Sequence, residues 1–118
     1  MGGSQVYVGV DVHKNYSWVC AMDEKGKIFF ERKVKSEELE DTIKEIPGNK
    51  TVILEPTTVT MPIAIKLRRT TEVKLAHPLK TKLIAESKKK TDKVRKVLAD
   101  LARTNFLPEA YLPPDDIL

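Results

Sequence analysis

Residues 5–12 read QVYVGVDV, and every second residue from Val6 to Val12 is a valine. Because successive side chains of a strand point to opposite faces, this alternation predicts a β-strand whose valine face covers a core. Asp11 belongs to the other face and stands at the carboxyl end of the strand. Two more stretches rich in strand-forming residues follow across short turns, at 16–22 and 27–34, so the sequence predicts an antiparallel three-strand meander.

Downstream of the meander, short apolar stretches alternate with amphipathic ones. Strands are predicted at 51–54 and 72–76, and helices at 36–46, 61–69, 78–87 and 91–103, with Ser36 and Thr91 as the N-caps of the first and last helix. The stretch TVIL at 51–54 is continuously apolar, which is typical of a strand buried on both faces. A meander followed by strand–helix units predicts an α/β fold with a mixed sheet and flanking helices, the layout of the ribonuclease H-like fold.

The chain of 118 residues has the length of one domain. It contains no run of about 18 apolar residues that could span a bilayer. Residues 1–4 lack the basic and apolar parts of a signal peptide, so we interpret them as a leader or a cloning remnant. The single cysteine, Cys20, cannot form an internal disulfide, which fits a reducing compartment. We therefore expect a cytoplasmic protein without a membrane partner.

Positive charge is concentrated in the second half of the chain. Residues 61–96 contain twelve lysines and arginines and three acidic residues, a formal charge of +9, whereas the rest of the chain carries −5. Such a block attracts polyanions, because phosphates release counterions when lysines bind them. A solvated lysine-rich surface is the alternative interpretation. The best candidates for nucleic-acid contacts are five lysines: Lys80, Lys82, Lys88, Lys89 and Lys90.

Three carboxylates stand where predicted elements begin or end. Asp11 ends the first strand, Glu55 follows the strand at 51–54, and Asp92 begins the last helix. The carboxyl ends of neighbouring parallel strands meet at one edge of a sheet, so Asp11 and Glu55 are expected to lie together there. Clustered carboxylates favour Mg²⁺ or Mn²⁺, which can promote phosphodiester cleavage. The alternatives are polar strand ends for Asp11 and Glu55, and a favourable interaction with the helix dipole for Asp92.

Five short motifs occur in order along the chain. They are GVDVHK at 9–14, LEPT at 54–57, PLKTK at 78–82, KTD at 90–92 and LPEAYLPP at 107–114. On these motifs the sequence resembles the N-terminal domain of the DEDD-type transposases of insertion sequences, a family that includes the pilin-gene inverting recombinase. The resemblance implies a RuvC-like variant of the ribonuclease H fold, a divalent-metal site, and DNA transposition and recombination by a multimer. It also implies a structured guide RNA as a partner in some members.

By this resemblance, Asp11, Glu55 and Asp92 are the first three acids of the catalytic, metal-binding tetrad. The fourth acid is expected three residues after Asp92, where this sequence has Arg95. Residues three apart share a helix face, so Arg95 is expected to point to the place of a metal ligand. A guanidinium group cannot bind a cation, and we therefore expect an altered site that binds Mg²⁺ or Mn²⁺ weakly.

The resemblance also implies a domain organisation. Residues 5–104 correspond to the RuvC-like catalytic domain, and residues 105–118 to an extended tail that leads toward a second domain with a serine nucleophile. We expect the chain to be a fragment or a truncated remnant that is inactive alone. The apolar residues of the tail are expected to pack on their own sheet or on a second copy, giving a weak homodimer.

The remaining candidate residues have ordinary explanations. His13 is expected in a loop beside the site. The aromatic residues Tyr16, Trp18, Phe29 and Phe30 lie on predicted strands. There they are expected in the core or on a sheet face rather than as a platform that stacks on bases.

The sequence therefore predicts the catalytic domain of a DNA transposase or recombinase. Two alternatives stay open. One is a non-catalytic module of the same fold that binds nucleic acid or serves assembly, and the other is a nuclease of the Holliday-junction resolvase kind. Two bound metal ions would favour the transposase, and cleavage of a four-way junction by this chain alone would favour the resolvase.

Overall fold

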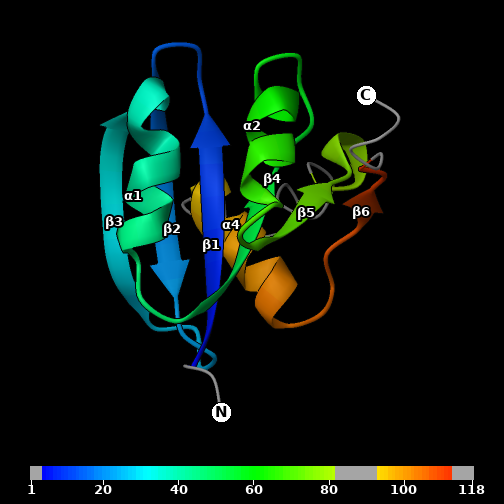
Figure 1. The fold of residues 1–118 in the computed structure, drawn as a ribbon. Coiled ribbons are helices and arrows are strands. Elements are labelled where there is room, and N and C mark those ends of the chain that lie inside the picture. The colour runs from blue at the N-terminus through cyan, green and yellow to red at the C-terminus, as the bar shows by residue number, and fades with distance from the viewer. Residues whose placement is uncertain (1–3, 82–92, 113–118) are drawn as a thin grey trace.

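Six strands form one mixed sheet in the order β3-β2-β1-β4-β5-β6 (Figure 1). A computed structural model describes residues 4–81 and 93–112. Its elements, in chain order, are β1 (Gln5–Val12), β2 (Tyr16–Met22), β3 (Ile28–Lys35), a 3-10 helix (Ser36–Glu38), α1 (Leu39–Glu45), β4 (Asn49–Leu54), α2 (Thr60–Leu67), β5 (Glu72–Ala76), α4 (Val94–Arg103) and β6 (Glu109–Ala110). Strands β1, β2 and β3 form the antiparallel meander, and β4 and β5 run parallel to β1. The ribonuclease H-like layout expected from the sequence is confirmed.

The first predicted helix starts differently from the expectation. Ser36 opens the short 3-10 helix, and α1 begins only at Leu39, without a side-chain cap. The Ser36 hydroxyl instead donates to the carbonyl oxygen of His13 at 2.7 Å and lies 2.8 Å from the hydroxyl of Ser17. This serine therefore ties the end of β3 to the β1–β2 turn and to the start of β2.

The last helix is also shorter at its start than predicted. It begins at Val94, after the extended residue Lys93, and not at Thr91, which lies outside the described residues. Residues 78–81 are helical, as predicted, and the rest of the predicted helix 78–87 lies outside the described part of the chain.

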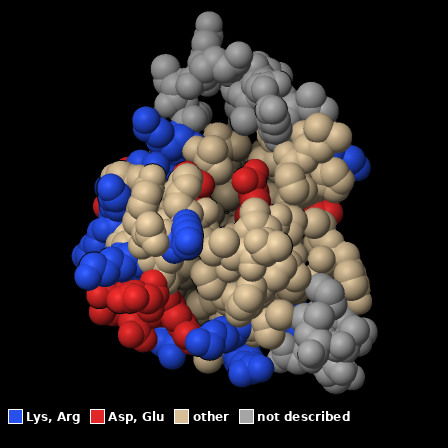
Figure 2. Space-filling view, turned by 90° about the horizontal axis from the view of Figure 1, so that it is seen from above, with Lys and Arg blue, Asp and Glu red and all other residues tan. Residues whose placement is uncertain are grey.

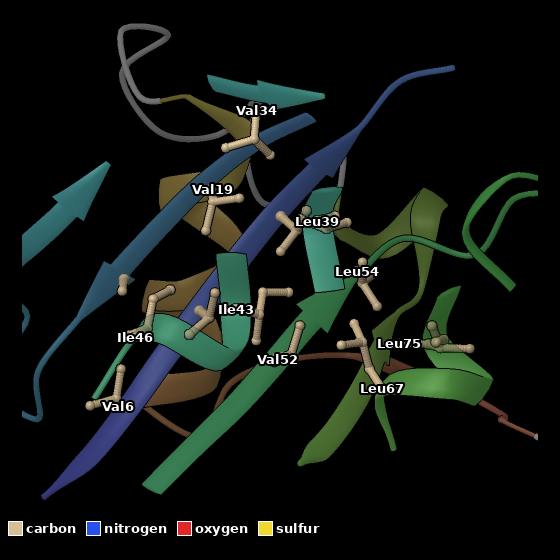
Figure 3. Packing of buried hydrophobic residues seen from close by; sticks show 14 residues of the cluster. Val6, Val19, Val34, Leu39, Ile43, Ile46, Val52, Leu54, Leu67 and Leu75 are labelled. Carbon is tan, nitrogen blue, oxygen red and sulfur yellow. The ribbon is translucent and has the colours of Figure 1, made fainter. Parts of the chain in front are cut away.

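The main core fills the space between the sheet and the two helices α1 and α2 (Figures 1 and 3). The valines of β1 point into this layer, as their alternation predicts, and Val8 is fully buried. Leu39 and Ile43 of α1 and Leu67 of α2 close it from the helix side. Burial of these side chains stabilises the fold by about 1.5–3 kcal/mol each.

A smaller cluster forms on the opposite face of the sheet, which α4 covers. Ile53 of β4 and Ala76 of β5 meet Leu98 of α4 there. Gly9 of β1 lets the helix come close, because a Cβ at this position would overlap the carbonyl oxygen of Arg95 and lie 2.9 Å from the amide nitrogen of Ala99. The missing side chain of one strand residue therefore sets how closely α4 approaches the sheet.

Part of the predicted tail belongs to the sheet. β6 pairs antiparallel with β5 through Ala110 opposite Leu75 and Glu109 opposite Ala76. Ala110 and Leu112 pack against the main core, and Leu107 packs against the smaller cluster. In the described residues, no helix is both long enough and apolar enough to cross a membrane.

Candidate metal centre

Asp11 and Glu55 lie on neighbouring parallel strands, on the face that α4 covers. Gly9 opposite Ile53 is the last pair between β1 and β4, and this register continued by two residues would place Asp11 opposite Glu55, the first residue after β4. Ile53 faces α4, so Asp11 and Glu55, two residues further along their chains, belong to that face as well. Neighbouring strands lie about 4.8 Å apart, so the two carboxylates are close enough to bind the same cation.

Electrostatics show that the two carboxylates interact. Burial raises the pKa of Glu55, and the negative charge of Asp11 raises it further. Both effects disfavour a second negative charge at this place. The ring nitrogen Nε2 of His13 donates to Oδ2 of Asp11 at 3.2 Å, so the expectation of His13 beside the site is confirmed. The pair is therefore an acidic site that a cation would stabilise.

The loop after β4 fixes the backbone of Glu55. The hydroxyl of Thr60 donates to the carbonyl oxygen of Glu55 at 2.6 Å, and the amide of Thr57 donates to that hydroxyl oxygen at 2.7 Å. Thr60 is also the first residue of α2 and is buried. The motif LEPT thus carries both the acidic residue and part of the hydrogen-bond network that holds it.

The site lies at the end of the molecule toward which β1 and β4 run. Figure 2 views this end and shows acidic atoms near its middle, with Lys and Arg atoms gathered along one side. Lys80, which follows β5, is exposed, and its amide donates to Nδ1 of His77 at 3.3 Å. The other predicted site residues, Asp92, Lys82, Lys88, Lys89 and Lys90, lie outside the described residues.

The side chain of Arg95 is held by one residue of β2 and one residue of β3. Its guanidinium lies 4.1 Å above the ring centroid of Trp18, and its Nε donates to Oε2 of Glu31 at 2.6 Å. The side chain is thus directed to β2 and β3, where an aromatic face and a carboxylate compensate its charge. The metal-ligand position that the sequence assigns to Arg95 stays a prediction, because Trp18, on which the guanidinium stacks, lies directly opposite Asp11.

The donor chemistry of the acidic pair fits a hard divalent cation. Carboxylate oxygens are the ligands that Mg²⁺ and Mn²⁺ prefer, and a cation between Asp11 and Glu55 would remove their mutual repulsion. Over residues 4–81 and 93–112, no group of three or more His, Cys, Asp or Glu side chains has an arrangement that could hold a metal ion. The described part of the chain thus supplies two carboxylates toward such a site.

Apart from His13, the sequence did not indicate which side chains lie around Asp11 and Glu55. The ring of His13 stacks on that of Tyr16, with centroids 4.8 Å apart, and Nζ of Lys33 lies 4.4 Å from the Tyr16 centroid. The alternation of β2 and β3 indicates which residues share a face. It does not indicate which part of this face the described residues leave uncovered, because that depends on where α4 packs.

The sequence matches a family of known proteins. A protein-family model described as a transposase, of the DEDD type of IS110 elements, matches residues 8–118. No curated protein is similar enough to the chain to count as a match. The matched range contains both strands that carry the acidic pair.

Proposed function

Since the chain belongs to the DEDD transposase family, we propose that Asp11 and Glu55 hold a divalent cation at which a DNA phosphodiester is cleaved during transposition. The observation that carries this proposal is the pairing of the two carboxylates at the ends of parallel strands, with the pKa of Glu55 raised by burial and by Asp11. The repulsion between the two carboxylates destabilises the site without a cation, and a bound cation would remove this repulsion.

The residues of the chain have separate roles in this proposal. Asp11 and Glu55 supply oxygen ligands, His13 orients the Asp11 carboxylate, and Thr60 holds the Glu55 backbone in place. The bound ion, Mg²⁺ or Mn²⁺, supplies an activated water and stabilisation of the leaving oxygen. Asp92 is proposed as a third carboxylate ligand. The low number of ligands on the described strands supports weak binding.

The partner is proposed to be DNA, held through its phosphates by Lys80, Lys82, Lys88, Lys89 and Lys90. A guide RNA and a second copy of the chain belong to the same proposal, because the family resemblance implies both.

Thermal unfolding with and without metal tests the acidic pair. Mg²⁺ or Mn²⁺ is expected to raise the melting temperature of the unaltered chain, because a ligand that binds only the folded state stabilises it. Asp11→Asn and Glu55→Gln should abolish this shift. Glu37→Gln, an exposed acid of the 3-10 helix, is the matched control and should keep it. An equal metal-induced shift in the Glu55→Gln variant would refute the proposed site.

A second candidate function is a non-catalytic nucleic-acid-binding module. It is favoured by Arg95, which stands where the family resemblance expects the fourth acid and is held by Glu31 and Trp18. The two functions differ in one assay. Binding of DNA without any cleavage in Mn²⁺, by a chain whose melting temperature Mn²⁺ does raise, would favour the binding module.

A further inference from the structure

We infer that the part of the sheet face that α4 leaves open among the described residues, at His13, Tyr16 and Lys33 beside the acidic pair, binds the unpaired bases of a DNA single strand. This inference rests on the proposed function, because it takes DNA as the partner, and it adds where the strand lies and how it is held. The surface consists of His13, Tyr16 and Lys33 and is called the aromatic–basic face below.

The sheet register aligns this face with the site. Asp11 of β1 lies opposite Trp18 of β2, and Trp18 lies opposite Lys33 of β3. Directly opposite residues of antiparallel strands share a face. One row across three strands therefore carries a carboxylate of the proposed metal site, an indole ring and an ammonium group in that order.

The side chains of the aromatic–basic face are accessible to solvent, whereas Val34 on the other face of β3 is buried. Tyr16 is 37% exposed, whereas Val34, on the opposite face of β3, belongs to the main core. Lys33 is exposed as well. Among the described residues, α4 packs on β1 and β2, and none of them buries these side chains. Large aromatic side chains that stay exposed near a site indicate a contact surface.

The chemistry of the face matches an unpaired nucleotide. The stacked rings of His13 and Tyr16 offer a π-surface that a base can extend, since every base has a face that stacks on aromatic rings. Lys33 lies against the Tyr16 ring and places a positive charge where a phosphate follows the base. In a duplex the bases already stack on one another, so this arrangement favours a single strand.

The charge of the face also selects a polyanion. Glu31 lies two residues before Lys33 on the same face of β3. Its carboxylate forms an ion pair with Arg95. An apolar protein segment would meet alternating rings and charges here, which is a poor match for a hydrophobic contact. Because His13 donates to Asp11, a base on the His13–Tyr16 stack brings its neighbouring phosphodiester to the acidic pair.

The test measures fluorescence anisotropy of a labelled oligo(dT) of about 12 nucleotides, the length of one single-strand site, with the full 118-residue chain in EDTA. EDTA removes metal, so the aromatic–basic face is measured apart from the acidic pair. Tyr16→Leu should weaken binding by about tenfold, and Tyr16→Phe, which keeps the ring, should restore it. A duplex of the same length should show no effect of either change.

Lys33→Gln has a matched control on the same strand. Lys33→Gln should lower the salt dependence of single-strand binding by about 0.7 in slope, the value for one phosphate contact. Arg32 is the next residue and faces the other side, against the Phe30 ring, so Arg32→Gln should leave the slope unchanged.

The outcomes separate this inference from the proposed function. If the unaltered chain binds neither single-stranded nor duplex DNA, DNA is not its partner and both are wrong. If it binds DNA but Tyr16→Leu and Lys33→Gln bind as tightly as the unaltered chain, only the inferred face is wrong. Tighter binding of an RNA oligonucleotide than of the DNA strand would also overturn it.

Discussion

Arg95 connects the first turn of α4 to two strands at once. Its guanidinium stacks on Trp18 of β2 and forms an ion pair with Glu31 of β3 at 2.6 Å. The arginine side chain is nearly buried, so both contacts form in a medium of lower polarity than water. At this residue, a side chain that cannot bind metal has a structural role instead.

The stability of this contact can be measured with a double-mutant cycle. Arg95→Met keeps an apolar stem over Trp18 and removes the charge, and it should lower the free energy of unfolding by about 2 kcal/mol. Glu31→Gln in the Arg95→Met background should cost less than Glu31→Gln alone, giving a coupling energy of about 1 kcal/mol in urea denaturation. Additive effects of the two changes would mean that the ion pair does not stabilise the fold.

Cys20 gives a second prediction at this scale, for alkaline pH. Burial, and secondly the charge of Glu31, raise the pKa of this thiol from 9.0 to about 11. Between pH 9 and 11 the folded state keeps its thiol proton while the unfolded state loses it, so stability falls as the pH rises through this window. Urea denaturation should therefore show a steeper loss in the unaltered chain than in Cys20→Ala. Equal slopes in the two proteins would contradict the raised pKa.

The sequence predicts contacts between residues in local patterns better than contacts between residues far apart along the chain. The proximity of Asp11 and Glu55 was predictable because strand ends and parallel pairing follow from local patterns, and their role as metal ligands stays a prediction. The orientation of Arg95 was not predictable, because its partner Glu31 is 64 residues away, and spacing along one helix carries no information about that contact. Asp92 stays a prediction, since it lies outside the described residues.

At the scale of elements, the contact of α4 with β1 depends on one glycine. Gly9 leaves room for the helix backbone at Arg95 and Ala99, so no side chain separates the two elements. The strands β1 to β5 could be predicted to within two residues, since their patterns are local signals. The start of α1 could not, because Ser36 forms its hydrogen bonds with residues brought near by the fold.

Gly9→Ala tests this packing. A methyl group has no space there, so α4 must move away from β1, at a cost of about 3 kcal/mol in unfolding free energy. Fluorescence of Trp18, the only tryptophan, should change as Arg95 leaves its ring. Gly26→Ala is the control: its φ of 86° makes alanine unfavourable in a turn, by about 1 kcal/mol, and its Cβ would meet the flexible end of the Arg103 side chain, at 3.0 Å, and not the backbone of α4. An unchanged Trp18 spectrum in Gly9→Ala would show that the helix tolerates the methyl group.

At the scale of the whole molecule, the end of the described chain closes one side of the sheet. The carbonyl oxygen of Pro108 accepts a hydrogen bond from the amide of His77 at 2.6 Å, and β6 continues the pairing. Phe106 and Tyr111 remain 72% and 74% exposed. The sequence indicated apolar residues in this segment, but not which of them the sheet would cover, because a two-residue strand leaves no periodic pattern.

Removal of residues 106–118 should therefore lower the unfolding free energy by about 3 kcal/mol, through the lost burial of Leu107, Ala110 and Leu112. Removal of residues 113–118 alone keeps all of these contacts and serves as the control. Light scattering on the same variants tests the proposed homodimer. A dimer that persists without residues 106–118 would show that Phe106 and Tyr111 do not form its interface.

The late position of α4 has a consequence for biosynthesis. The ribosome delivers β1 through β5 before α4, so the sheet emerges while Ile53 and Cys20, both fully buried in the finished fold, still lack the helix that packs over their face. A nascent chain arrested before residue 94 should therefore expose an apolar sheet surface and bind chaperones. The acidic pair can come together at that stage, but the helix that packs against its strands is synthesised only after β5.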